Sequence, residues 1–241
     1  MPAEPGRPAG PDPAAGPDTV LEADRPAENY GPADLHPAVD QSFAVDQSLA
    51  VDQVLAADLR RAADLILARP PRLGRVRLVA VDGPSGSGKT VFATALVELL
   101  RAGGHRVELF STDLLATWTD PFGWWDRFRA DVLVPLEWGR AGAVIVNDWA
   151  NGQPVAGPMV RVDPVEMVIV EGVSSGRTAA AELLSVLIWV EVAGAQVRLE
   201  RAVTRDGEVD RAELMAWQRA EDRHFTAEAT VSRADLHVNP R

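Results

Sequence analysis

Cysteine is absent from this sequence of 241 residues, which excludes disulfides, thiolate metal sites and thiol nucleophiles. Lysine occurs once, at Lys89, and the other 23 of the 24 basic residues are arginine. Histidine is also scarce, and the four copies show no ligand spacing such as H-x-x-x-H, so a structural zinc site is not expected. They are His36, His105, His224 and His237.

Long apolar runs are missing as well. No stretch approaches the roughly 18 apolar residues that a membrane span needs. The N-terminus is rich in proline and acidic residues, without the basic and apolar regions of a signal peptide. These absences predict a soluble cytoplasmic protein that does not act at a membrane, and they leave its oligomeric state open.

Basic surface is scarce too, although the net charge of −11 is unevenly distributed. Residues 1–59 hold 11 acidic side chains and two arginines, a net charge of −9, whereas residues 60–241 have a net charge of −2. Neither part offers the basic face that nucleic-acid binding requires, so no nucleic-acid partner is expected.

Residues 1–49 are predicted to be a disordered acidic tail. Nine of the 18 prolines lie in residues 1–37, with few large apolar side chains, and such a composition cannot bury enough surface to fold. A hexapeptide repeat follows, with copies at residues 39–44, 45–50 and 51–56. Three copies are too few for a solenoid, and slippage in a tolerant linker or a partner-binding role both remain open.

The sequence is organised around a phosphate-loop motif, G-x-x-x-x-G-K-T, at Gly83–Thr90. An apolar run from Val76 to Val81 precedes it, and apolar residues at helical spacing follow it. In this context the loop amides and the helix N-terminus bind phosphate oxygens, Lys89 reaches the β- and γ-phosphates, and Thr90 holds Mg²⁺. The loop residues are Gly83, Pro84, Ser85, Gly86, Ser87, Gly88, Lys89 and Thr90.

The single lysine strengthens this interpretation. A sequence so biased toward arginine retains lysine where a compact ammonium on a flexible stem is needed and a planar guanidinium would not fit.

Alternating strand and helix patterns predict an α/β fold for residues 50–241. An amphipathic helix is expected at residues 50–68, a strand at 107–110, a helix at 126–138 and short strands at 143–146 and 155–162. Buried strands at 165–170 and 186–192 flank a helix at 179–184, and further helices at 195–204 and 210–228 precede a last strand at 235–238. Such alternation favours a parallel sheet with ligands at the carboxyl ends of its strands.

Four charged residues are candidates for transfer chemistry. Asp113 follows a strand and could deprotonate an acceptor hydroxyl or hold Mg²⁺ through water. Glu171 follows an apolar strand, where a Walker-B-type carboxylate would orient Mg²⁺. Arg201 and Arg205 share one face of a helix and could bind the transferred phosphoryl group. The alternatives are turn acids and a solvated charged face.

The acceptor side is less distinct. Asp148 and Trp149 follow a short strand, and the insert before them is rich in tryptophan, so a ring could stack on a planar substrate. Most of these aromatic residues are expected to be core.

Several segments in order resemble the uridine kinase-like branch of the P-loop nucleoside and nucleotide kinases. They are GPSGSGKT, STD, NDWANG, VIVEGV, LIWVEV and RLERAVTRDG, within residues 74–241. The resemblance implies a three-layer fold with a five-stranded parallel sheet, helices on both faces and a short lid near Arg198–Gly207. It also implies transfer of the γ-phosphate of ATP to a hydroxyl, with Asp113 as the acceptor-activating residue and Arg201 and Arg205 as lid arginines.

The sequence thus predicts an ATP- and Mg²⁺-dependent kinase whose acceptor is a small molecule with a hydroxyl group, a nucleoside among the candidates. Two alternatives stay open. One is an ATP-binding regulatory or scaffold protein without kinase activity. The other is a nucleotide or coenzyme-precursor kinase, which would need more cations near Asp113 than the insert's Arg127 and Arg129.

Overall fold

A five-stranded sheet in which every pairing is parallel forms the centre of the computed structural model, which describes residues 48–148, 154–207 and 211–240. The strand order is β2-β5-β1-β6-β7. The strands are β1 (Arg77–Asp82), β2 (Val107–Ser111), β5 (Met167–Glu171), β6 (Leu184–Val190) and β7 (Leu236–Val238). This confirms the predicted α/β fold class; the predicted tail, residues 1–49, lies almost entirely outside the described residues.

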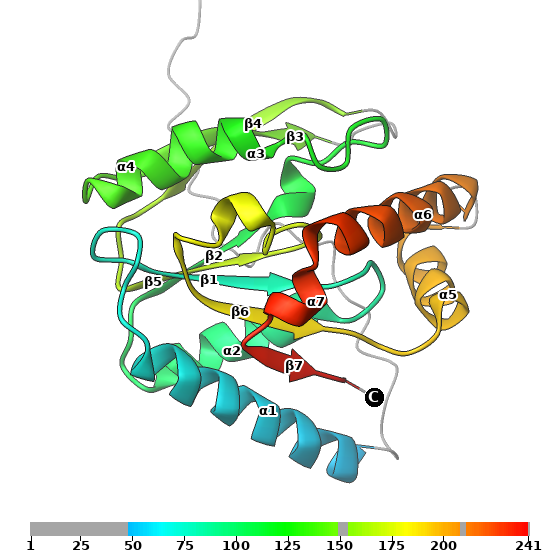
Figure 1. Cartoon of the computed structure of the whole chain (residues 1–241), viewed down its shortest axis with the longest axis horizontal. Helices are drawn as coiled ribbons and strands as arrows, with labels where there is room; N and C mark the ends of the chain where they lie inside the picture. Colours follow the sequence, from blue (N-terminus) through cyan, green and yellow to red (C-terminus); the bar gives the residue numbers. More distant parts are fainter. Residues whose placement is uncertain (1–47, 149–153, 208–210, 241) are drawn as a thin grey trace, which may run out of the picture. The chain divides into compact units, whose positions relative to one another are not determined.

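Helices cover both faces of the sheet because its strands are apolar on both sides. Val79 and Val81 face a core that includes Ile66 and Phe92, whereas Leu78 and Ala80 face a second core with Phe128. α1 (Ser48–Ala68) and α2 (Lys89–Ala102) supply the first core. Figure 1 shows α1 and α2 on one side of the sheet and α3 and α4 on the other.

The second face carries the insert between β2 and β5. Its helical stretch is α3 (Trp125–Phe128), a π-helical segment at Arg129–Leu133 and α4 (Val134–Glu137). β3 (Gly142–Asp148) and β4 (Val155–Val162) form a separate antiparallel hairpin that packs on this stretch through Val144 and Val162.

The prediction of a helix at residues 179–184 is wrong. Only a 3₁₀ turn at Thr178–Ala180 forms, and β6 begins at Leu184, which pairs with Leu78 of the central strand. Ser185 donates a hydrogen bond to the Pro70 carbonyl at 2.9 Å, which further holds this segment in the sheet. Tertiary pairing overrides local helix propensity here.

α5 (Ala195–Asp206) and α6 (Arg211–Glu228) follow β6 and lie beside one another near the carboxyl ends of the strands (Figure 1). α7 (Thr230–Arg233) leads into β7. In the described part of the chain, no helix is long and apolar enough to cross a membrane.

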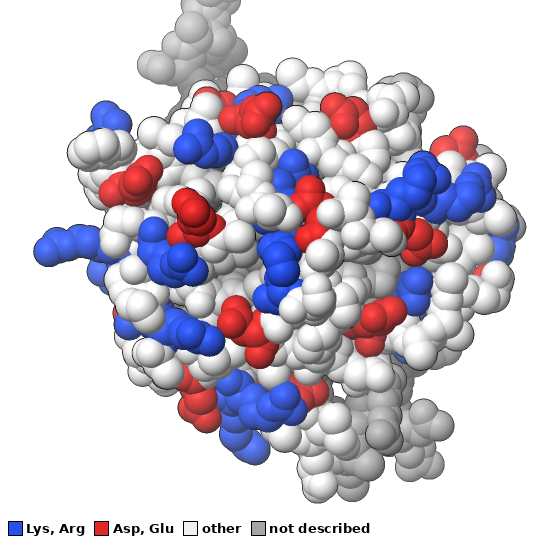
Figure 2. All heavy atoms as spheres, in the orientation of Figure 1, with Lys and Arg blue, Asp and Glu red and all other residues white. Residues whose placement is uncertain are grey.

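Charged side chains of both signs are interspersed over the face of the molecule in Figure 2. This face therefore carries no broad field of one sign.

Candidate active site at the carboxyl end of the sheet

The phosphate loop joins β1 to α2, in the strand–loop–helix context that the motif predicted. Glycine is required at two positions of the loop, because the backbone of neighbouring elements lies too close to leave room for a side chain. A Cβ at Gly83 would overlap the carbonyl oxygen of Val190, and a Cβ at Gly86 would overlap that of Arg198. The loop is thus held tightly against β6 and α5. The Oγ of Ser87 is buried and has no hydrogen-bond partner, as expected for a loop that binds a ligand.

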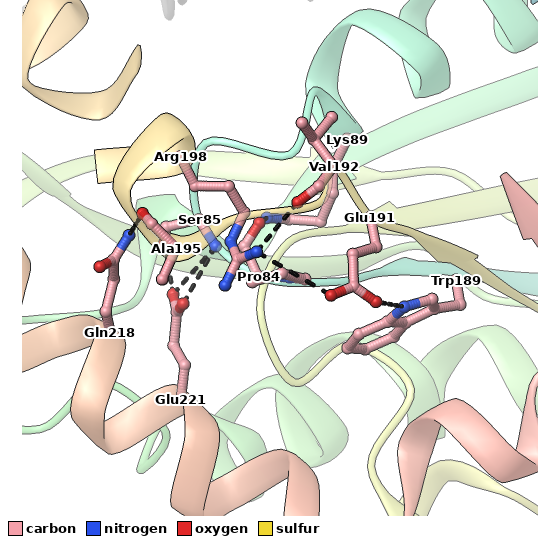
Figure 3. A network of polar contacts seen from close by, with 10 residues as sticks. All are labelled: Pro84, Ser85, Lys89, Trp189, Glu191, Val192, Ala195, Arg198, Gln218 and Glu221. Carbon is pink, nitrogen blue, oxygen red and sulfur yellow. Dashed lines mark hydrogen bonds and ion pairs between the residues drawn. The ribbon is translucent and has the colours of Figure 1, made fainter. Parts of the chain in front are cut away.

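Lys89 is only 7% exposed, and its Nζ donates a hydrogen bond to the Pro84 carbonyl at 3.1 Å (Figure 3). Burial raises the pKa of three nearby carboxyl groups, those of Asp82, Glu171 and Glu221, and the positive charge of Lys89 partly opposes each rise. The only lysine therefore lies among three acids, and they come from three different elements.

Asp82 is the last residue of β1 and is completely buried. Its carboxylate accepts hydrogen bonds from the backbone N–H groups of Gly83 (2.7 Å), Ser174 (2.9 Å) and Gly176 (2.8 Å). Burial raises its pKa to about 6 despite these bonds. Asp82 thus ties the phosphate loop to the loop that follows β5. Its role was not predicted from the sequence, although a lone acid at the end of a buried strand is a usable signal.

Glu171 and Thr90, the two residues predicted to hold a metal, lie within hydrogen-bond distance of one another. The Thr90 hydroxyl donates to Glu171 Oε2 at 3.3 Å, while Oε1 of the same buried carboxyl has no hydrogen-bond partner. Burial, and next the negative charge of Asp113, raise the pKa of Glu171 to about 7. Asp113 is exposed, in a 3₁₀ turn directly after β2.

These oxygens fit Mg²⁺. The ion binds to proteins through one or two carboxylates and keeps waters and phosphate oxygens as its other ligands. Glu171 provides a buried carboxylate oxygen without a hydrogen-bond partner, and Thr90 provides a neighbouring hydroxyl. The two residues thus supply part of the ligand set that such an ion needs. Among the described residues, no group of three or more His, Cys, Asp or Glu side chains forms a complete metal cage.

Glu221 is the unexpected member of the site. It lies on α6, is only 1% exposed, and accepts hydrogen bonds from Ser85 of the phosphate loop. Both the backbone N–H of Ser85, at 3.0 Å, and its hydroxyl donate to this carboxylate (Figure 3). Burial raises the pKa of Glu221 above its ordinary value. Nothing in its local sequence pattern distinguishes it from the other acids of α6.

The arginines of α5 divide into two groups. Arg198 is buried at 7% exposure, donates to the Val192 carbonyl at 2.9 Å and lies 3.9 Å from Glu191. Its Nε is buried without a partner. Arg201 and Arg205 are exposed, and in the described part of the chain no hydrogen bond joins Arg201 to the phosphate loop. The structure thus places the backbone of Arg198 against Gly86 of the loop, and the roles of Arg201 and Arg205 stay predictions.

The predicted acceptor residues are only partly described. Asp148 is exposed at the end of β3, and Trp149 lies outside the described residues. The neighbouring Asn147 donates a hydrogen bond to the Ala116 carbonyl at 3.0 Å, which ties the hairpin to the segment after Asp113.

Aromatic residues of the insert meet α6 and the loop after β5. Trp118 packs edge-on against Trp217, with ring centroids 5.5 Å apart, and Phe122 stacks on His224 at 4.2 Å. The guanidinium of Arg177 lies over the Trp124 ring, 4.5 Å from its centroid. α6 therefore contacts the phosphate loop through Glu221 and the insert through Trp217 and His224.

No family model matches this chain, and no curated protein matches it significantly. Solved structures do match. A possible uridine kinase from Bacillus stearothermophilus has 20% identity and a TM-score of 0.57, over 76% of this chain and 98% of that one. A candidate fructose transport system kinase from a Silicibacter species has 21% identity and a TM-score of 0.56, with the same coverage of both chains. The chain therefore has the fold of the uridine kinase-like P-loop proteins.

Proposed function

We propose that this protein transfers the γ-phosphate of ATP to a hydroxyl group of a small molecule, with Mg²⁺ as the cofactor. One observation carries the proposal. The phosphate loop, the Thr90–Glu171 pair and Asp113 converge at neighbouring strand ends, and the charge of Asp113 acts on Glu171. A loop alone would indicate nucleotide binding, whereas two carboxyl groups beside it supply a metal ligand and an acceptor-side base.

The loop amides and Lys89 would bind the phosphates of ATP, and Thr90 with Glu171 would hold the metal. Bound Mg²⁺ offsets the negative charge that develops on the phosphate oxygens. The chain's own part is to position these groups and to exclude water, because phosphoryl transfer depends mostly on positioning and charge stabilisation.

Asp113 would accept the proton of the acceptor hydroxyl as the oxygen attacks the γ-phosphorus. It is exposed, so an acceptor can reach it, and it lies near the proposed metal ligand Glu171. Arg201 and Arg205 are proposed to approach the phosphates only when the α5 region closes, since both are exposed in this structure.

The acceptor would lie between Asp113, Asp148, Trp149 and the aromatic residues of the insert. Two structures of the same fold carry the names of a possible uridine kinase and a candidate fructose transport system kinase. Uridine and fructose both carry several hydroxyl groups, which supports a polyhydroxylated small molecule, a nucleoside or a sugar, rather than a nucleic acid or a lipid.

The test is incubation with Mg-ATP and a panel of nucleosides, sugars, nucleotides and small alcohols, read by mass spectrometry. Some acceptor should gain the mass of one phosphate. Lys89→Ala should abolish ATP binding and transfer together. Asp113→Asn should retain ATP binding but lower kcat by about 10²- to 10⁴-fold, the usual range for loss of a general base.

Full activity of Lys89→Ala would overturn the assignment. ATP binding without transfer to any acceptor would instead indicate a regulatory nucleotide-binding protein. Transfer only to monophosphates would indicate a nucleotide kinase.

A further inference from the structure

The phosphate loop already holds an anion, the carboxylate of Glu221. We propose that Glu221 is an internal competitor of the nucleotide's phosphates, so that α6 closes the loop when nucleotide is absent and withdraws when it binds. This inference rests on the proposed function, because it takes the loop to be a nucleotide site.

The contacts show why the two anions compete. Both Glu221 oxygens lie within hydrogen-bond distance of the Ser85 backbone N–H, at 3.0 and 3.2 Å, and one of them also accepts from the Ser85 hydroxyl. Lys89 provides the nearby positive charge. A phosphate group bound by a loop of this type uses the same kinds of donor, backbone N–H groups and the lysine ammonium.

Coexistence would be costly. Glu221 is 1% exposed, so little water screens its charge, and a phosphate at the same donors would lie within a few ångströms of it. The carboxylate must therefore move away or lose its charge before a triphosphate can use Ser85.

Withdrawal of Glu221 would change contacts beyond the loop, because α6 also contacts α5 and the insert. Gln218 donates to the Ala195 carbonyl of α5 at 3.2 Å. Trp217 packs on Trp118, and His224 stacks on Phe122. Nucleotide binding would thus loosen the contacts between α6 and the insert on the acceptor side.

A purely supporting role for Glu221 makes the opposite prediction. If the carboxylate only holds the loop in shape, its removal weakens nucleotide binding. If it competes, its removal strengthens binding. The sign of the change in affinity distinguishes the two roles.

The main experiment measures the Kd for Mg-ATP by calorimetry in the full chain, the Glu221→Gln variant and the Asp222→Asn variant. Gln keeps the size of Glu221 but not its charge. Asp222→Asn removes one charge from an exposed position of the same helix and is the matched control. Glu221→Gln should lower Kd by about tenfold, since a hydrogen bond to a charged group is stronger than a neutral one. An unchanged or higher Kd, with Asp222→Asn at the wild-type value, would overturn the proposal.

Hydrogen exchange supplies a second measurement that does not depend on a variant. In the wild-type chain, Mg-ATP should protect residues 83–90 and speed exchange in residues 214–225 of α6. Greater protection of α6 would overturn the proposal.

Failure of all three proteins to bind Mg-ATP would refute the proposed function. The contact itself is then tested without nucleotide. Exchange at residues 83–90 should be faster in Glu221→Gln than in wild type and Asp222→Asn, and equal rates would overturn the role of Glu221.

Discussion

At the scale of single residues, the site concentrates charged side chains at positions that water hardly reaches. One lysine lies among the carboxyl groups of Asp82, Glu171 and Glu221, and each of these groups is at most 1% exposed. Burial raises the pKa of all three, and Lys89 opposes each rise. One ammonium cannot neutralise three carboxylates, so part of the negative charge must be relieved by protons, a metal ion or displacement.

Asp82 offers a prediction on pH. The pKa of Asp82 rises from 3.8 to about 6 in the folded state. Between about pH 4 and 6 the folded chain therefore keeps a proton on Asp82 that the unfolded chain has already released. The stability of wild type relative to Asp82→Asn should therefore fall by roughly 2 kcal/mol as the pH rises from about 4 to 6, and then stay level.

Denaturant unfolding of both proteins across this range measures the difference, and the Asn variant cancels the titration of other groups. A flat difference would mean that the three backbone N–H donors offset the cost of burying the charge.

At the scale of elements, α5 and α6 form one wall of the site, and α5 approaches the phosphate loop closely. The backbone of Arg198 lies where a side chain at Gly86 would have to go, and Glu221 of α6 reaches Ser85. The loop is thus in direct contact with both helices, and a movement of the loop must displace them.

Gly86→Ala tests this link, with Gly88→Ala as the matched control. Both glycines have positive φ, +75° and +89°, so alanine costs about 1–2 kcal/mol of backbone strain at either position. Only at Gly86 does the new Cβ also overlap α5; at Gly88 the nearest atom is Pro240 Cγ at 3.6 Å.

Gly86→Ala should therefore lower the free energy of unfolding by about 2 kcal/mol more than Gly88→Ala and speed hydrogen exchange in α5. Equal effects of the two variants would show that α5 does not constrain the loop.

At the scale of the whole molecule, the negative charge is concentrated toward the N-terminal end of the chain. Residues 1–59 have a net charge of −9 and residues 60–241 of −2. The described residues begin with α1 at Ser48, and Ala62 and Ile66 of this helix are fully buried against the sheet. The folded unit therefore needs α1.

Removal of residues 1–47 should leave the Tm within a degree or two of wild type and leave the affinity for ATP unchanged, because their composition supplies little apolar surface for folding. Removal of residues 1–69, which includes α1, should lower the stability by several kcal/mol, since it uncovers fully buried apolar side chains. Thermal unfolding of the two truncated chains makes the comparison. A large loss of Tm in the shorter deletion would contradict the predicted disorder of the tail.

The phosphate loop, the fold class and most elements could be predicted from the sequence because they depend on local patterns. Glycine spacing, a lysine and a threonine define the loop, and apolar periodicity defines strands and helices. The meeting of Asp113 with Glu171 also followed, since the carboxyl ends of parallel strands share one edge of the sheet. The roles of Arg201, Arg205 and Asp148 stay predictions, and Trp149 lies outside the described residues.

Asp82 left a local signal at the end of a buried strand, whereas only the tertiary structure could bring Arg198 and Glu221 to the phosphate loop. Glu221 lies 136 residues from Ser85 along the chain, and its place depends on how α6 packs across the strand ends. No local pattern encodes that packing. The sequence by itself thus determined the phosphate-loop motif and its place between a strand and a helix, and the fold decided which charges surround it.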